Sequence, residues 1–299
     1  MSRTRGVRYN PEKTTGVPIC PHKSEANPKT TRNSPETHPK KIDLHNHTAL
    51  CNHAEGSVRE YVEAAVAAGI DVFGFSDHAP MDFDPKYRMK FDEMQLYRAM
   101  VMEVKEAYRD RIEILFGYEV DYLEGHMDER VLNAEVDYLI GSVHFIDGWG
   151  FDNPEFIGHY EHADIDEIWR RYFDAVEAMA ASRLFDIAGH LDLIKVFRFL
   201  PRGDIVSIAS KALDAVADAG MALEINVAGY RKPVEEAYPS PALLRAAFER
   251  GIPVTFGSDA HKPEQVGLFR NEAEALAKAA GYTECVYFRN REMIRVPLG

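Results

Sequence analysis

From residue 42 onward, the sequence alternates short runs of apolar and β-branched residues with longer amphipathic segments. Parallel strands need long crossover connections, which are usually helices, so this alternation predicts a parallel β-sheet with helices between its strands. Seven such β/α units without an internal linker favour an α/β barrel, whose functional site lies at the carboxyl ends of the strands. The expected strands are Ile42–His47, Asp71–Ser76, Ile112–Tyr118, Val136–Val143, Phe185–Gly189, Ala222–Val227 and Pro253–Ser258.

The segments between these strands carry helix signals. The clearest is Ser57–Ala68, where Ser57 and Glu60 form a capping box, apolar residues recur at helical spacing, and Gly69 supplies a stop. The tail Cys285–Pro297 predicts a closing hairpin. The other expected helices are Asp92–Tyr108, His126–Asn133, Asp164–Ala181, Ile205–Ala219, Pro241–Arg250 and Pro263–Ala280.

Six of the seven expected strands end in, or are followed at once by, a side chain that can bind a metal ion. Seven of the twelve histidines fall at or just beyond such an end. Because the carboxyl ends of the strands meet on one side of a barrel, we expect these side chains to converge on a metal centre. The nine candidate ligands are His45, His47, His53, His78, Glu119, His144, His190, Asp259 and His261.

The first strand shows how two of these ligands reach one ion. Side chains alternate between the two faces of a strand, so His45 and His47 share a face and both imidazoles can contact the same metal. His53 lies beyond the strand, on a loop that can fold back. Cys51 could bind zinc as a thiolate, but with so many imidazoles and carboxylates nearby we interpret it as a small buried residue.

Nine candidate ligands exceed the roughly four to six positions around one ion, so two or three divalent metal ions are expected. Glu119 and Asp259 are the candidates for bridging ligands. Mixed imidazole and carboxylate ligation favours Zn, Fe or Mn over Mg or Ca. Asp77, which precedes His78, is predicted either to orient a ligand or to handle a proton.

Charge and cysteine usage narrow the classes of partner. Residues 1 to 41 hold nine Lys and Arg against three acidic residues, so the rest of the chain carries a net charge of −19. So acidic a body argues against nucleic acid as the main partner. No apolar run approaches the length of a membrane span, and three cysteines without a pairing pattern predict a cytoplasmic setting.

The basic stretch at residues 1–40 stands apart from the body at residues 41–299. Its Arg, Ser and Thr content is compatible with a transit peptide. However, five prolines between residues 11 and 35 prevent an amphipathic helix, and its three acidic residues are unfavourable for such a signal. We therefore expect a disordered basic extension preceding a single catalytic domain.

The ligand motifs resemble the polymerase and histidinol phosphatase (PHP) family. The likeness runs in order from about residue 42 to the end of the chain. Four stretches are similar to the histidinol-phosphate phosphatase branch: Leu50-Cys51-Asn52-His53-Ala54-Glu55-Gly56, Gly141-Ser-Val-His144, Gly189-His-Leu-Asp-Leu193 and Gly257-Ser-Asp-Ala-His261. The motifs that match the family as a whole are His45-x-His47, Ser76-Asp77-His78, Glu119, Ser142-Val143-His144, Gly189-His190-Leu191-Asp192 and Asp259-x-His261.

This resemblance implies a distorted seven-stranded (β/α)7 barrel with three metals at the strand ends. By analogy with the family, one metal is held by His45, His47, Glu119 and Asp259. A second is held by His53, His78 and His190, and a third by Glu119, His144 and His261. The chain departs from the family chiefly in its basic extension, and Ser76 replaces a threonine that often precedes Asp-His.

A multinuclear site of this kind can activate a bridging water and hold the oxygens of a phosphoryl group. The expected reaction is hydrolysis of a small phosphomonoester, with L-histidinol phosphate implied by the resemblance. Asp121, Asp192 or Glu235 could receive the amine of that substrate. Residues expected to act in catalysis are Asp77, Glu119, Asp259 and His261, and the cations expected to bind phosphate are Arg88, Lys195, Arg198 and Arg231.

Three alternatives stay open at the level of sequence. A related phosphoesterase could act on another phosphomonoester or on a nucleotide. An amidohydrolase-like enzyme would share barrel ends rich in His and Asp, but no strand ends in a suitable bridging lysine. A non-enzymatic PHP module would be indicated by lost ligands, and none is lost. The oligomeric state is not indicated.

Overall fold

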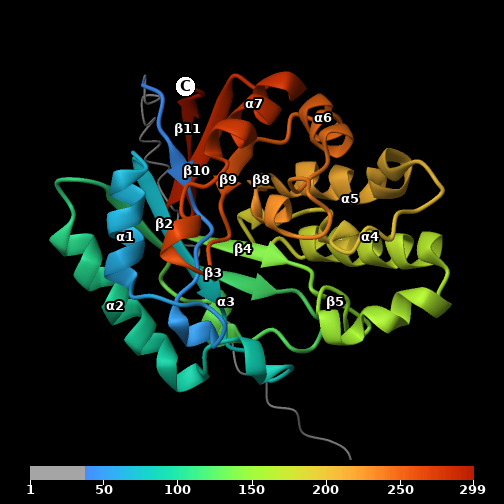
Figure 1. Ribbon diagram of the computed structural model, residues 1–299, viewed down its shortest axis with the longest axis horizontal. Coiled ribbons are helices and arrows are strands. Elements are labelled where there is room, and N and C mark those ends of the chain that lie inside the picture. The colour runs from blue at the N-terminus through green and yellow to red at the C-terminus, as the bar shows by residue number, and fades with distance from the viewer. Residues whose placement is uncertain (1–37) are drawn as a thin grey trace, which may run out of the picture. The chain divides into compact units, whose positions relative to one another are not determined.

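Seven parallel strands organise residues 38–299, the part of the chain that this computed structural model describes (Figure 1). The order of hydrogen-bonded neighbours is β1-β2-β3-β4-β7-β8-β9, which follows the chain. This confirms the predicted seven-stranded α/β barrel. The strands are β1 Ile42–Asp43, β2 Val72–His78, β3 Glu113–Asp121, β4 Tyr138–Ser142, β7 Ile187–Ala188, β8 Ala222–Asn226 and β9 Val254–Gly257. The predicted extension at residues 1–40 lies almost wholly outside the described residues.

The first and last strands meet and nearly close the barrel. The backbone N–H of Leu44 donates to the carbonyl of Phe256 at 2.8 Å, and that of Ala260 donates to His45 at 3.3 Å. A further bond of 3.0 Å runs from the N–H of His47 to the carbonyl of Ala260. Closure brings the end of β1 against the end of β9, although the two are more than 200 residues apart in sequence.

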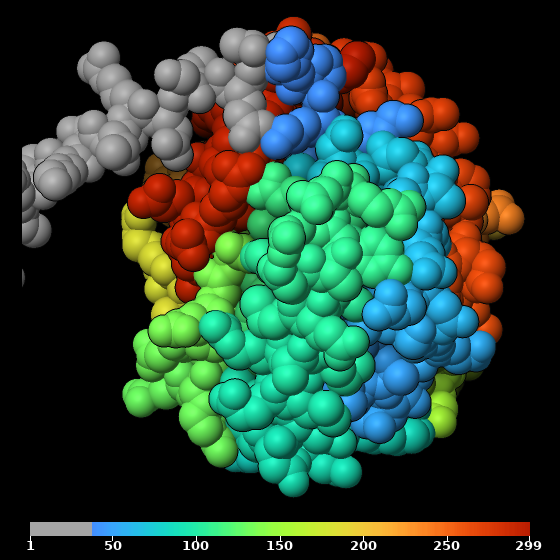
Figure 2. Space-filling view, turned by 90° about the vertical axis from the view of Figure 1, so that its left-hand side faces the viewer, coloured from blue at the N-terminus to red at the C-terminus, as the bar shows by residue number. Residues whose placement is uncertain are grey.

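Helices surround the sheet in Figure 1, and the side chains of α1 and α2 cover one face of the barrel in Figure 2. The predicted capping box of α1 is present: the Ser57 hydroxyl accepts the N–H of Glu60, whose carboxylate accepts the N–H of Ser57. The α-helices are α1 Val58–Ala67, α2 Met94–Ala107, α3 Glu129–Leu132, α4 Ile165–Ala181, α5 Ile205–Ala219, α6 Pro241–Glu249 and α7 Arg270–Ala280.

Two predicted helices are shorter than expected. The segment His126–Asn133 is helical only over α3. The segment Pro263–Ala280 begins with a single 3-10 turn, η7 Pro263–Gln265, and becomes α-helical only at Arg270. Gly267 lies between them with a positive φ, and its N–H donates to the buried carboxylate of Asp43 at 3.2 Å. This tertiary bond favours a turn where local sequence favours helix.

A small hairpin and a 3-10 helix that were not predicted from the sequence follow β4. Strands β5 Phe145–Ile146 and β6 Trp149–Gly150 pair around Asp147-Gly148, both with positive φ. Asp-Gly is a strong signal for such a turn, so the hairpin was detectable. The segment continues into η4 Pro154–His162. The remaining 3-10 turns are η1 Ala49–Cys51, η2 Pro85–Tyr87, η3 Phe91–Glu93, η5 Leu193–Lys195 and η6 Ala228–Arg231.

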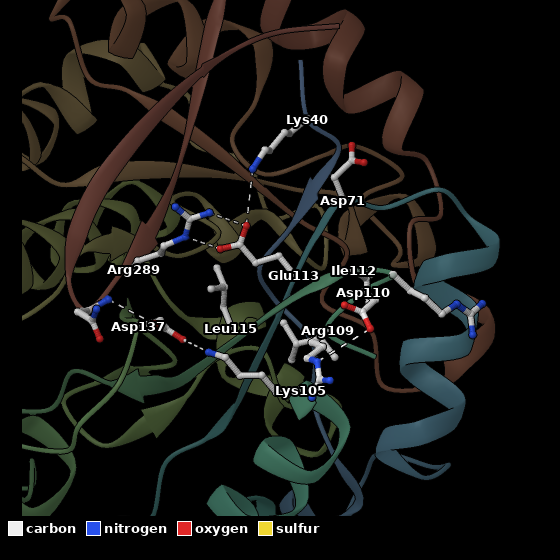
Figure 3. A pocket seen from close by; sticks show the side chains of 13 residues that line it. Lys40, Asp71, Lys105, Arg109, Asp110, Ile112, Glu113, Leu115, Asp137 and Arg289 are labelled. Atoms are coloured by element: carbon white, nitrogen blue, oxygen red, sulfur yellow. Dashed lines mark hydrogen bonds and ion pairs between the residues drawn. The ribbon is translucent and has the colours of Figure 1, made fainter. Parts of the chain in front are cut away.

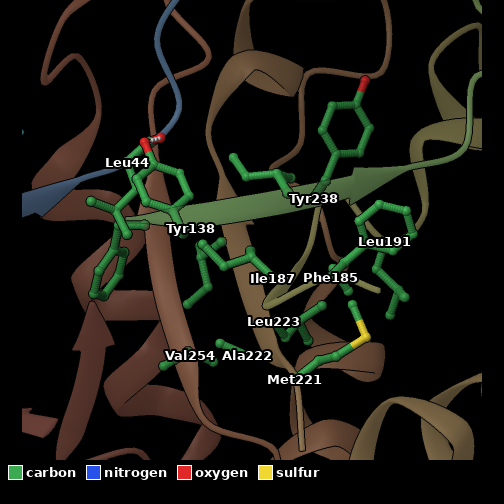
Figure 4. Close-up of a cluster of buried hydrophobic side chains, with 14 of the residues drawn as sticks. Leu44, Tyr138, Phe185, Ile187, Leu191, Met221, Ala222, Leu223, Tyr238 and Val254 are labelled. Atoms are coloured by element: carbon green, nitrogen blue, oxygen red, sulfur yellow. Dashed lines mark hydrogen bonds between the residues drawn. The ribbon is translucent and has the colours of Figure 1, made fainter. Parts of the chain in front are cut away.

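The barrel interior is filled by side chains from facing strands (Figure 4). Tyr138 crosses the interior, and its hydroxyl donates to the carbonyl of Leu44 at 2.6 Å. Gly74 makes this possible, since a Cβ there would lie 2.1 Å from the Tyr138 hydroxyl. The layer is completed by residues such as Ile187, Leu223 and Val254, all buried. This packing keeps one end of the barrel closed beneath the functional side chains.

The predicted closing hairpin is confirmed as β10 Glu284–Arg289 paired with β11 Glu292–Pro297. Near its tip lies a cleft of about 730 Å³, at the amino-terminal ends of the strands (Figure 3). Its charges pair with one another: Arg289 with Glu113 at 2.5 Å and Lys105 with Asp137 at 3.2 Å. In a barrel this end serves stability, so this cleft is not where we place the chemistry. None of the helices in residues 38–299 has the length and apolar character that a membrane crossing requires.

Candidate metal centre

Glu119, at the carboxyl end of β3, is the central residue of the candidate site. Its side chain is buried, although a lone carboxylate is costly to remove from water. Burial raises the pKa of this carboxyl, but the surrounding imidazoles hold it well below its usual range. Oxygen atoms of Glu119 lie within 3.7 Å of nitrogen atoms of five imidazoles, those of His45, His47, His78, His144 and His190.

The first group of ligand atoms combines β1 and β9. Asp259 Oδ1 lies 3.2 Å from His47 Nε2 and 3.9 Å from His45 Nε2. Glu119 Oε2 approaches the same two nitrogen atoms. Both histidines follow β1, which ends at Asp43 and is shorter than the predicted strand Ile42–His47. This grouping of four agrees with the set implied for one metal.

The second group differs from the implied set. His190 Nε2 lies 2.9 Å from Glu119 Oε1, and His144 Nε2 lies 3.7 Å from the same oxygen. The resemblance had assigned His190 to a metal with His53 and His78 instead. The barrel order explains the difference, because β7 pairs directly with β4 and so places His190 beside His144.

The third group gathers His47, His53, His78 and His261. His261 Nε2 lies 2.9 Å from His53 Nε2, and ligand atoms of His47, His78 and His261 lie within 4.8 Å of one another. The resemblance had placed His261 with Glu119 and His144. The closure of β9 against β1 instead places His261 beside His53. All nine predicted ligands are therefore brought together, with His190 and His261 exchanged between two of the three groups.

Several ligand nitrogen atoms are buried without a hydrogen-bond partner among the described residues, namely His45 Nε2, His47 Nε2 and His78 Nδ1. Buried polar atoms normally find a partner, so such a concentration of orphaned acceptors requires an explanation. Neutral imidazole nitrogen and carboxylate oxygen are the donor set that Zn, Fe and Mn prefer. The residues present thus fit a group of divalent cations.

Three buried carboxylates hold the outer nitrogen atoms of the ligand imidazoles. His45 Nδ1 donates to Glu224 at 2.7 Å, and His144 Nδ1 donates to Asp121 at 2.5 Å. His47 Nδ1 lies 3.4 Å from Asp77, consistent with the predicted orienting role of that residue. Such partners fix the ring tautomer and aim the inner nitrogen at the metal. Glu224 is not among the site residues predicted from the sequence. An acid within the apolar run Ala222–Val227 is unusual, but it does not indicate which residues the side chain contacts.

The four cations predicted to bind phosphate have different environments. Arg88 is buried and donates to Asp121, behind His144. Lys195 is buried and donates to Glu236 at 2.5 Å and to the carbonyl of Ala237 at 2.7 Å. Arg198 is exposed, 3.6 Å from a carboxylate oxygen of Glu235. Arg88 and Lys195 therefore each donate to a protein carboxylate.

Arg231 is placed most favourably for an anionic substrate. Its Nη2 donates to the backbone carbonyls of Ser258 and Asp259, at 2.8 and 3.0 Å. Its Nη1 is buried and has no hydrogen-bond partner in residues 38–299. Burial lowers the pKa of this guanidinium, yet arginine remains charged in proteins. An unpaired donor beside a candidate metal ligand is suited to a phosphate oxygen.

Cys51 lies near the third group, with ligand atoms of His53 and His261 within 4.8 Å of its sulfur. The thiol donates to the carbonyl of Thr48 at 3.1 Å. Burial raises the pKa of the thiol, and a thiol that keeps its proton is a poor metal ligand. These contacts favour the interpretation of Cys51 as a small buried residue.

Comparison with known proteins agrees with this geometry. Residues 43–228 match the PHP domain and residues 243–279 match the PHP-associated family. A probable histidinol-phosphatase of Deinococcus radiodurans is 45% identical over 257 residues, covering 84% of this chain and 97% of the relative. The histidinol-phosphatase of Bacillus subtilis is 29% identical, covering 76% and 96%.

A solved structure gives the same fold. The histidinol phosphate phosphatase of Lactococcus lactis, complexed with Zn, L-histidinol and phosphate, superposes with a TM-score of 0.69. The two proteins are 25% identical, and the match covers 86% of this chain and 99% of that one. The match to the family over most of the barrel, with all nine ligand positions present, shows that the chain belongs to the PHP family.

Proposed function

We propose that the protein is a metal-dependent histidinol-phosphatase that hydrolyses L-histidinol phosphate to L-histidinol and phosphate, a reaction of histidine biosynthesis. The observation that carries this proposal is the convergence of seven imidazoles with Glu119 and Asp259 at the carboxyl ends of the strands. Relatives that match most of this chain carry the histidinol-phosphatase name.

The proposed cofactor is a cluster of two to three divalent ions, with Zn, Fe or Mn as the candidates. Zinc is supported by its presence in the related Lactococcus structure. When bound, such ions supply a Lewis acid for the phosphoryl oxygens and a water with a lowered pKa. Glu119 and Asp259 are suited to hold them as anionic ligands, because the neighbouring imidazoles hold the pKa of each carboxyl well below its usual range despite burial.

The other residues of the site bind and position. Arg231, whose guanidinium is held on the carbonyls of Ser258 and Asp259, is the cation that we assign to the phosphate, where it would orient the substrate for in-line attack. Asp77 and Asp121 keep His47 and His144 in the tautomers that face inward. Asp121 is occupied by His144 and Arg88 and is not free to receive the substrate amine. Asp192 Oδ2 is occupied by Lys195 and the N–H of Ser240, whereas its buried Oδ1 has no hydrogen-bond partner in residues 38–299.

The test is an assay of phosphate release on the purified protein, with bound metal measured on the same sample. L-Histidinol phosphate is compared with p-nitrophenyl phosphate and with several sugar and nucleoside phosphates. We expect histidinol phosphate to have the highest kcat/KM and the protein to hold two or three metals per chain. A better substrate would move the proposal to another phosphomonoester, and fewer than two metals would overturn the cluster.

No observation favours a second function. A non-enzymatic role would be indicated by missing ligands, and every predicted ligand is present in the described part of the chain. The proposed partner is a small phosphomonoester, and a cytoplasmic location stays a prediction.

A further inference from the structure

Glu224 contacts ligands of two different groups at once. Its Oε1 accepts the Nδ1–H of His45 at 2.7 Å, and its Oε2 accepts the backbone N–H of His190 at 2.9 Å. His45 belongs to the first group of ligands and His190 to the second. Asp77 makes a comparable pair of contacts, with the His47 imidazole and the backbone N–H of His78, whereas Asp121 contacts a ligand imidazole of the second group alone, through His144.

The position of Glu224 is built by its surroundings. Its side chain is 1% exposed, and Gly257 on the neighbouring strand β9 leaves the space that it fills. A Cβ at Gly257 would lie 2.0 Å from Glu224 Oε1. His190 has a φ of +20°, which is unusual for a residue with a side chain, and the bond to Glu224 holds its backbone there.

Asn226 extends the same connection to Asp259. It lies two residues beyond Glu224 on β8, so both side chains project to one face of the strand. Asn226 Nδ2 donates to Glu224 Oε2 and to Asp259 Oδ2, each at 3.2 Å. Its Oδ1 accepts the N–H of Ala228 at 2.9 Å, which orients the amide with its donors toward the two carboxylates.

We propose that Glu224 and Asn226 form an outer bridge that couples occupancy of the first and second metal positions. The inference rests on the proposed metal centre. A metal held by His45 and Asp259 fixes the tautomer of His45 and so the orientation of Glu224 and Asn226. The same Glu224 then holds His190 in place for the second metal. Binding at either position thereby organises the other. This coupling through the outer bridge adds to the link that the two positions have through Glu119.

The bridge predicts how metal binding changes in Glu224→Gln. The glutamine side chain has nearly the same size, but its amide offers one oxygen where the carboxylate offers two. It can therefore accept from His45 or from the N–H of His190, and its NH2 group faces the other donor. We expect the first two zinc ions, taken up in one steep step by the native protein, to bind in two separate and weaker steps. Loss of an outer partner typically weakens metal binding about 10- to 100-fold.

The experiment is a zinc titration of the metal-free protein at buffered free zinc, with bound zinc per chain measured by mass spectrometry. Asp121→Asn is the matched comparison, since it removes a buried carboxylate that contacts a ligand of the second group alone. It should weaken the second position and leave the bridge intact, so that the two zinc ions still bind in one step, at a higher free zinc concentration. Circular dichroism of the metal-free proteins checks that each variant is folded, and Asn226→Ser supplies a second, smaller perturbation of the bridge if Glu224→Gln does not fold.

The outcomes separate this inference from the proposed function. Native protein that binds fewer than two zinc ions overturns the metal centre itself. Native protein that binds its zinc in one step, with a folded Glu224→Gln protein that titrates identically or loses only one ion, overturns the outer bridge alone. Splitting of the step in Glu224→Gln, or in Asn226→Ser, supports the bridge, and an unsplit step in a folded Asn226→Ser protein counts against it.

Discussion

At the scale of single residues, the contacts of a histidine decide whether it belongs to the candidate metal centre. His144 has its outer nitrogen on Asp121 and its inner nitrogen 3.7 Å from Glu119. His159, by contrast, is exposed and packs against Trp149, with the ring centroids 4.1 Å apart and the rings tilted by 31°. The two histidines lie 15 positions apart in the chain, but only one of them belongs to the candidate centre.

We expect His144→Ala to lower kcat at least about 100-fold, because it removes a candidate metal ligand and leaves Asp121 Oδ1 without its imidazole donor. His159→Ala is the matched control and should keep native activity. Both proteins are assayed for phosphate release and for bound metal. Native turnover in His144→Ala would exclude that residue from the site.

Arg231 is the cation that we expect to act on the substrate. Arg231→Met keeps much of the side-chain volume and removes the donors, so kcat/KM should fall about 100-fold or more. Arg202→Met serves as control, because Arg202 is exposed and pairs with Asp166 at 3.0 Å. Equal steady-state constants for native protein and Arg231→Met would remove the guanidinium from phosphate binding. Metal content measured on each variant separates loss of substrate binding from loss of metal.

At the scale of elements, the packing of β2 against β4 across the barrel interior positions the segment that carries His45. Tyr138 occupies the space above Gly74 and bonds the end of β1 through Leu44. That bond lies one residue before His45. The strands that carry the ligands are therefore positioned by an apolar layer, not by the ligands themselves.

Gly74→Ala should destabilise the fold by about 1 to 3 kcal/mol, because its Cβ has no room beside the Tyr138 hydroxyl. Gly158→Ala, in η4, is the control, since a Cβ there meets nothing within 4 Å. Urea unfolding of the metal-free proteins measures both changes. Adding Tyr138→Phe to Gly74→Ala should recover part of the loss, and a Gly74→Ala protein as stable as the native one would show that the layer adjusts freely.

At the scale of the whole molecule, the metal centre ties strands from every part of the barrel together. Its candidate ligands lie at or just beyond the carboxyl ends of β1, β2, β3, β4, β7 and β9, so bound ions add links that the metal-free chain lacks. Ligand-bound states gain stability through mass action, by about 2.7 kcal/mol at a free ligand concentration 100 times the dissociation constant.

Removal of the metals with a chelator should therefore lower the melting temperature by several degrees and abolish phosphatase activity. Addition of zinc or manganese should restore both. Differential scanning fluorimetry with a parallel assay provides the measurement. A melting temperature that does not respond to chelator, on protein shown to lose its metal, would argue that the ions contribute nothing to the fold.

The division of the chain into residues 1–40 and residues 41–299 is a proposal that can be tested in the same assays. A chain that begins at residue 38 should have the melting temperature, metal content and kcat/KM of the full-length protein, because every candidate ligand follows residue 41. A loss of activity in the shortened chain would assign a catalytic or structural role to the basic extension.

The sequence by itself determined the seven-stranded barrel, the nine candidate ligands and the end of the barrel where they gather. These follow from local signals: alternation of apolar runs, the capping box at Ser57, and histidines placed after strands. The same signals fail where a distant contact overrides them, as at Gly267, whose bond to Asp43 turns the chain before α7.

Only the tertiary structure decided which ligands share a position. His190 stands beside His144 because β7 pairs with β4, and His261 stands beside His53 because β9 closes on β1. Glu224 could not be assigned from sequence, since its two partners, His45 and His190, are 179 and 34 positions away. Strand periodicity reports which face a side chain takes, whereas the neighbours of that side chain depend on strand order and closure, which link residues with no local relation.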